Sequence, residues 1–153
     1  RLCRDARIFS IYEGTTQLQV VAAIRYVTNG TYLGIIKEML EKEVAPEFQA
    51  LKGRVAKMVE KYEDAINYVK AAGNNDLHDF LARRLYEMTA EIIMSLLILD
   101  DATRAPELFA KSANVYVRYA EGAVAGHYAY IKEFKAEDLA DFLAAAPEEA
   151  PAE

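Results

Sequence analysis

The chain has 153 residues, of which 53% are hydrophobic, so it is long enough and apolar enough to bury one sizeable core. Its 24 acidic and 18 basic residues give a formal net charge of −6, which argues against a nucleic-acid-binding module with a basic face. The single cysteine, Cys3, cannot form an internal disulfide and favours a reducing, cytoplasmic compartment.

The first predicted interruption of the helical pattern is a turn at Tyr12-Glu13-Gly14. A helix is predicted to follow over 16–28. Thr16 and Gln19 fit a capping box, in which the threonine side chain accepts an N–H of the new helix. Asn29-Gly30 ends this helix as a left-handed cap, because glycine adopts positive φ without a steric cost.

Three apolar stripes follow in the middle of the chain. The first consists of Leu33, Ile36, Leu40 and Val44. The second follows Pro46, which suits the first turn of a helix, and consists of Leu51, Val55, Met58, Tyr62, Ile66 and Val69. Gly73-Asn74-Asn75 closes that helix, and Asp76 is the predicted N-cap of the next, whose stripe is Leu77, Leu81, Leu85, Met88, Ile92, Leu96 and Leu99. Spacings of three and four are those of one helix face.

The chain contains no run of about 18 uncharged apolar residues, the length that a transmembrane helix requires. The nearest is 92–99, which is too short and which we interpret as a buried helix segment. A turn is predicted over 100–105, and Pro106 begins a fifth helix. Its predicted packing face consists of Ser112, Val115, Tyr119, Gly122 and Gly126. The two glycines, four residues apart, favour close approach of a neighbouring helix, and simple tolerance of glycine is the alternative.

A short last helix is predicted over 136–145, and the acidic, proline-broken tail 146–153 is expected to be disordered. No alternating strand pattern occurs in the sequence. The sequence therefore predicts an all-α fold, an antiparallel bundle of about five to six helices with short connections.

The sequence gives little support for a metal site. The only histidines, His78 and His127, lack a glutamate three residues before them, so a carboxylate-bridged metal bundle is not expected and no metal ligand is predicted. We expect His127 to be a packed or half-exposed helix residue and His78 to be solvated. Tyr62 and Tyr119 are expected in the core, with their hydroxyls at its rim.

Glu13 is the unusual residue of the first turn. A carboxylate at this position can stabilise the start of the next helix, whose dipole favours negative charge. It can also act as a general base, held in a cleft by a turn that Gly14 makes rigid. The spacing alone favours the first role and leaves the second open.

The stretch RDARIFSIYEGTTQLQ, residues 4–19, resembles the signature near the C-terminal end of the acyl-CoA dehydrogenase family. The family pattern is roughly Arg-Asp-Ala-Arg/Lys-Ile, a spacer, and Ile-Tyr-Glu-Gly-Thr-x-x-Ile-Gln, and Leu18 conservatively replaces its isoleucine. The resemblance covers about a tenth of the chain. The helices after residue 29 resemble a C-terminal extension carried by one bacterial branch of the family.

The resemblance implies an FAD-dependent enzyme that oxidises an acyl-CoA thioester to the trans-2-enoyl-CoA. Glu13 matches the base that removes the α-proton, and Gly14 matches a substrate-contacting position. Thr15, Thr16 and Gln17 match positions that contact FAD. Arg25 falls where some members carry a CoA-contacting arginine.

The resemblance also implies a division of the chain. Residues 1–28 correspond to the last part of the catalytic helical domain and 29–145 to the helical extension. Because the chain begins at Arg1, it is expected to be a C-terminal fragment that binds FAD weakly alone and is inactive alone. The parent is expected to be a homo-oligomer that passes electrons to an electron-transfer flavoprotein or another acceptor. A non-catalytic helical interaction or oligomerisation module is the alternative.

Overall fold

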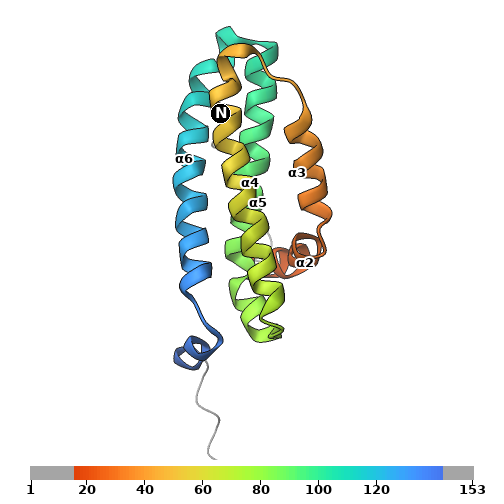
Figure 1. The fold of residues 1–153 in the computed structure, drawn as a ribbon, viewed down its shortest axis with the longest axis vertical. Helices are drawn as coiled ribbons and strands as arrows, with labels where there is room; N and C mark the ends of the chain where they lie inside the picture. The colour runs from red at the N-terminus through yellow and green to blue at the C-terminus, as the bar shows by residue number, and fades with distance from the viewer. Residues whose placement is uncertain (1–15, 143–153) are drawn as a thin grey trace, which may run out of the picture.

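The computed structural model describes residues 16–142, which form an elongated bundle of helices (Figure 1). The elements are α2 (Thr16–Thr28), α3 (Thr31–Glu41), the 3-10 turn η2 (Pro46–Phe48), α4 (Gln49–Ala71), α5 (Asn75–Arg104), α6 (Pro106–Glu133) and the 3-10 turn η3 (Ala136–Asp141). No strand occurs in these residues. The predicted all-α bundle is confirmed.

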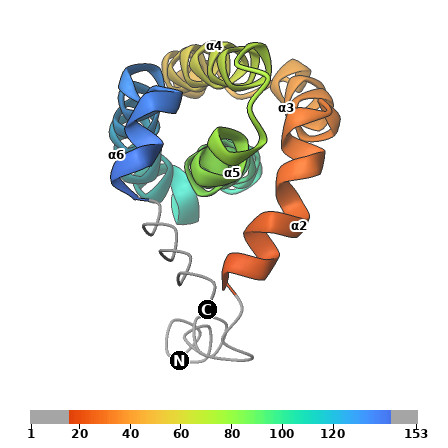
Figure 2. The same cartoon turned by 90° about the horizontal axis from the view of Figure 1, so that it is seen from below.

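Helix α5 lies at the centre of the bundle (Figure 2). Helices α6, α4, α3 and α2 surround it on three sides, and each of them contacts it. On the remaining side no helix of residues 16–142 covers α5, and Arg83, Ala90, Met94, Leu97 and Asp101 are exposed there. This spacing of three, four and seven residues defines one uncovered face of α5.

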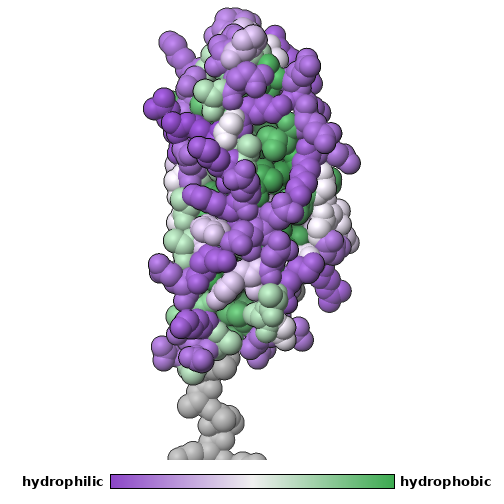
Figure 3. All heavy atoms as spheres, viewed as in Figure 1, coloured by the Kyte–Doolittle hydropathy of each residue, from purple (hydrophilic) through white to green (hydrophobic). Residues whose placement is uncertain are grey.

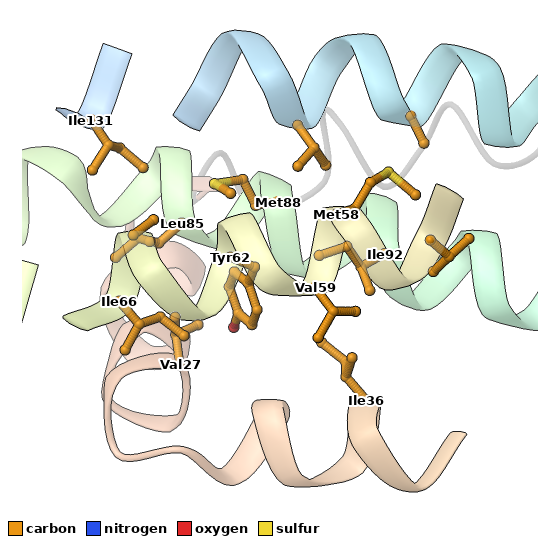
Figure 4. Packing of buried hydrophobic residues seen from close by; sticks show 14 of the residues in the cluster. Val27, Ile36, Met58, Val59, Tyr62, Ile66, Leu85, Met88, Ile92 and Ile131 are labelled. Carbon is orange, nitrogen blue, oxygen red and sulfur yellow. The ribbon is translucent and has the colours of Figure 1, made fainter. Parts of the chain in front are cut away.

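The two long apolar stripes form the core between α4 and α5 (Figure 4). Every residue of the predicted stripes on these two helices is buried, which confirms both predictions. Of the first predicted stripe only Ile36 is fully buried, whereas Leu33 and Leu40 are half-buried. Val44 is half-buried too, but it lies beyond the end of α3 at Glu41. The segment 92–99 lies within α5, but Met94 and Leu97 are exposed, so the predicted buried helix segment is confirmed only in part. None of the helices in residues 16–142 could span a lipid bilayer.

Tyr62 lies deeper than predicted. Its side chain is fully buried, and its hydroxyl lies 2.7 Å from the hydroxyl of Thr89 on α5 instead of reaching the rim. The Thr89 hydroxyl also lies 2.9 Å from the carbonyl oxygen of Leu85. A hydroxyl has one proton and a carbonyl can only accept, so Thr89 donates to Leu85 and Tyr62 donates to Thr89. Burial raises the pKa of Tyr62 to about 12.

Both predicted ends of α5 were wrong. The N-cap is Asn74, whose side-chain oxygen accepts the N–H groups of Asp76 at 2.9 Å and Leu77 at 3.0 Å, so Asp76 lies inside the first turn. At the other end the helix continues to Arg104, through most of the predicted turn 100–105. Asp100 pairs with Arg104 one turn later, at 2.7 Å, because residues four apart share a helix face.

The predicted packing face of α6 was also wrong. Ser112, Val115, Tyr119, Gly122 and Gly126 are all exposed to solvent, and Tyr119 is 63% exposed. The face that packs on α4 and α5 consists of Ala113, Val117, Ala120, Val124 and Ile131. Alanines on the inner face therefore provide the close approach that we expected from the glycines.

Replacing Gly122 or Gly126 by alanine is expected to raise the free energy of unfolding by about 0.5–1 kcal/mol each. Both lie inside α6, and no neighbouring atom lies within 4 Å of the position of an added Cβ. Urea denaturation measures the change. Gly73→Ala is the control and is expected to lower the free energy of unfolding, because Gly73 has a φ of 60°, which is unfavourable for a residue with a Cβ. Destabilisation by Gly122→Ala would show that another helix packs on this face.

A hydrophobic patch is visible between α3 and α4 in the upper half of the molecule (Figure 3). Between α3, α4 and α5 lies a cavity of about 20 Å³, lined by Met39, Val44, Leu96 and Leu99 together with Lys42, Glu43, Lys52 and Asp100. A volume of this size is close to that of one water molecule. The patch is therefore part of the packing between α3, α4 and α5 and is too small for an organic ligand.

Candidate functional site

The sequence-predicted site lies at the boundary of the described residues. Glu13, Gly14 and Thr15 lie outside them, so their roles stay predictions. Thr16 is the first residue of α2 and Gln17 the second, which agrees with the predicted start of this helix. The first turn of α2 contains no acidic residue, and the first N–H groups of a helix suit the oxygen atoms of an anionic group.

Helix α2 is attached to the bundle through one apolar face. Val20, Ile24 and Val27 are buried, at spacings of four and three residues, and the helix packs chiefly against α5. Arg25 is exposed in its last turn. With a rise of 1.5 Å per residue, Arg25 lies about 13 Å along the helix from Thr16. The predicted contacts at the start of α2 and at Arg25 are therefore too far apart for one small group, and only an extended ligand or two separate ligands could reach both.

A polar contact also holds the end of α2 to the first turn of α5. His78 Nε2 lies 3.2 Å from the Thr28 hydroxyl, which itself donates to the Ile24 carbonyl at 3.0 Å. Nδ1 of the same ring lies 3.0 Å from the carboxylate of Asp79. We expected His78 to be solvated, but its side chain is only 26% exposed because it bridges the two helices. The position of α2 therefore depends on a histidine 50 residues away.

A second group of polar side chains lies between α5 and α6. Phe80, Arg83, Arg84 and Glu87 of α5, with Tyr130 of α6, line a cavity of about 340 Å³, which we call the arginine pocket. The guanidinium carbon of Arg84 lies 4.2 Å from the centre of the Tyr130 ring. This is the geometry of a cation–π contact, which fixes the plane of the guanidinium.

His127 of α6 connects the charges beside this pocket. Its Nε2 lies 3.1 Å from the Glu87 carboxylate, and Arg84 approaches its Nδ1 in a long contact of 3.5 Å. Glu87 also accepts from Arg83 at 2.9 Å. Burial lowers the pKa of His127, with Glu87 opposing and Arg84 adding to the decrease. A neutral ring protonated on Nε2 satisfies both neighbours, since it donates to Glu87 and accepts from Arg84.

Sequence reasoning did not find the arginine pocket. Arg84 and His127 are 43 residues apart, on two helices, and no short motif joins them. His127 is packed, as predicted, with a side chain that is 18% exposed. The only available signal was the series Arg83, Glu87 and Glu91 at spacings of four, which reads as an ordinary charged helix face.

Comparisons with known proteins match the bundle. A family model described as the C-terminal part of acyl-CoA dehydrogenases matches residues 28–139. The crystal structure of an acyl-CoA dehydrogenase family protein from Porphyromonas gingivalis is 37% identical in sequence, with a TM-score of 0.70. The match covers 74% of the present chain and 98% of the solved chain. No match was found among curated proteins.

Proposed function

Because this chain belongs to the acyl-CoA dehydrogenase family, whose C-terminal part it matches over 28–139, we propose that it is the C-terminal portion of an FAD-dependent acyl-CoA dehydrogenase. The observation that carries the proposal is the motif of residues 4–19, which runs directly into α2 at Thr16. In this proposal residues 1–28 complete the catalytic helical domain and 29–145 form its extension.

Glu13 is proposed as the base that removes the proton α to the thioester carbonyl. That proton is only weakly acidic, so its removal requires stabilisation of the negative charge that develops on the enolate oxygen. The backbone N–H of the Glu13 turn is proposed to donate a hydrogen bond to this oxygen. Gly14 lets the backbone of the turn approach the thioester closely. FAD, when bound, accepts the hydride from the β-carbon.

Helix α2 positions the proposed site. The backbone N–H groups of Thr15, Thr16 and Gln17 are suited to hold anionic or carbonyl oxygens of FAD at the start of the helix. Arg25, exposed farther along α2, is suited to a phosphate of the CoA moiety. Since Val20, Ile24 and Val27 anchor the opposite face, the bundle acts as a rigid support for this turn.

The extension is also proposed to contact another part of the enzyme. Met94 and Leu97 on the uncovered face of α5 are 50% and 44% exposed. Uncovered apolar side chains on a helix favour an interface, here within a homo-oligomer or over the catalytic cleft. This observation also favours the alternative function, a non-catalytic helical oligomerisation module.

Anaerobic addition of acyl-CoA to the full-length protein tests the proposed function. The oxidised flavin is expected to lose its visible absorption as trans-2-enoyl-CoA forms in equal amount, because one hydride reduces one flavin. The electron acceptor that restores the colour, an electron-transfer flavoprotein or another protein, then identifies the partner. A full-length protein that binds no flavin, or whose flavin stays oxidised with acyl-CoAs of every chain length, would favour the oligomerisation module.

A further inference from the structure

The arginine pocket contains a cation that no carboxylate of residues 16–142 neutralises. Within residues 16–142, Arg54, Arg83 and Arg104 pair with carboxylates, whereas Arg25, Arg84 and Arg118 do not. Arg25 and Arg118 are exposed to water, and Arg84 is half-buried. A half-buried guanidinium loses part of its hydration, so a ligand that supplies negative charge is favoured there.

The neighbouring carboxylate is already engaged. Glu87 accepts from Arg83 at 2.9 Å and lies 3.1 Å from His127 Nε2. Arg84 in turn is oriented by the Tyr130 ring and by His127. A guanidinium has five N–H donors in a rigid fork, and these two contacts leave donors free on the side of the cavity. The fork geometry matches the oxygens of a phosphate group.

One side of the pocket is aromatic. Phe80 lines the cavity and stacks on Phe134, with ring centres 4.7 Å apart and planes inclined by 22°. Tyr130 stacks on the same Phe134 ring at 5.6 Å. Phe142 also lies against Phe80, with ring centres 4.9 Å apart, so the rings form one aromatic cluster. Phe80 and Tyr130 bring this cluster to the wall of the cavity, where it offers apolar contact to a planar base. The cavity volume of about 340 Å³ lies within the range of small-ligand sites.

We propose that the arginine pocket binds a phosphorylated nucleoside, with its phosphate on Arg84 and its base against Phe80 and Tyr130. Arg83, which is paired with Glu87, lies next to Arg84 at the rim, where it is 64% exposed. The shared chemistry fits both a free nucleotide and the phosphoadenosine end of a CoA thioester. The proposal needs no flavin and does not depend on Glu13.

Calorimetric titration of the 153-residue chain with adenosine 3′,5′-bisphosphate tests the proposal. We expect saturable binding, weakened roughly 10- to 100-fold by Arg84→Gln, because a charge-assisted pair of hydrogen bonds is lost. Arg118→Gln, at an exposed arginine of α6, is the matched control and should bind as the original chain does. Equal binding by the Arg84→Gln chain, or no saturable binding by the original chain, would overturn the proposal.

Further titrations measure the contributions of the base and of the phosphate separately, and they distinguish the two possible sources of the ligand. Adenosine and inorganic phosphate are each expected to bind more weakly than the bisphosphate, and equal binding by either one would overturn the combined site. Tighter binding of CoA than of ADP would identify the source as a CoA thioester, and the reverse a free nucleotide. Amide NMR shifts in the unsubstituted chain should centre on Phe80, Arg84 and Tyr130, and shifts elsewhere would overturn the location.

Discussion

Replacement of Glu13 by glutamine in the full-length enzyme is expected to lower kcat by roughly 10²- to 10⁴-fold, the contribution of a positioned general base. Glutamine keeps the size of the side chain and its hydrogen-bonding capacity but cannot accept the α-proton. Binding of acyl-CoA is expected to change little, because the substitution leaves the turn and Gly14 in place. Steady-state turnover with an artificial electron acceptor measures the effect.

Two controls separate the loss of the base from the loss of the fold. The visible flavin spectrum of the Glu13→Gln enzyme should match that of the original, which shows that the cofactor site is intact. Glu43→Gln, at an exposed carboxylate after α3, should leave kcat unchanged. Undiminished turnover by the Glu13→Gln enzyme would exclude Glu13 as the base and leave it the role of stabilising the start of α2.

Thr89→Val is expected to lower the free energy of unfolding by about 1–3 kcal/mol, although valine has nearly the same shape as threonine. The substitution removes the acceptor of the Tyr62 hydroxyl, which lies 2.7 Å from the Thr89 hydroxyl. Tyr62 is fully buried, so water does not replace the lost partner. Urea denaturation of the chain measures the change.

Tyr62→Phe is expected to cost less, about 0.5–1.5 kcal/mol, because the Thr89 hydroxyl keeps its bond to the Leu85 carbonyl. The double variant, with neither hydroxyl, is expected to be more stable than Thr89→Val alone, since it has no unpaired buried group. A double-mutant cycle thus measures the coupling of the pair. If the two effects simply add, the hydrogen bond between Tyr62 and Thr89 contributes nothing to stability.

The sequence predicted α4 and α5 well because their buried faces are formed mainly by large apolar residues. Leu81, Leu85 and Ile92 belong to an unbroken stripe of large apolar residues at spacings of three and four. The exposed face of α5 mixes Met94 and Leu97 with charged residues, so the periodicity still identifies the core side. Helix α6 is different, because alanines such as Ala113 and Ala120 face inward while Val115 and Tyr119 face solvent. Hydrophobic pattern alone assigns the wrong face when close packing requires small residues.

The candidate sites were predictable to different degrees. The motif of residues 4–19 is continuous in sequence, so Glu13 and its neighbours could be identified before any fold was known. The contact between His78 and Thr28 and the group around Arg84 both form only when distant helices pack together. Neither partner is unusual in its own helix, and only the antiparallel arrangement of α5 and α6 places Arg84 beside His127 and Tyr130.

The central position of α5 determines which parts of the chain can open independently. Since α5 contacts α2, α3, α4 and α6, its middle amide protons exchange with solvent only when the whole bundle unfolds. Helix α2 packs chiefly against α5, with smaller contacts to α3 and α4, so its amide protons are expected to exchange faster than those in the middle of α5. Hydrogen exchange therefore divides the molecule into a slow centre and a faster first helix, and the segment after the Glu13 turn belongs to the faster part.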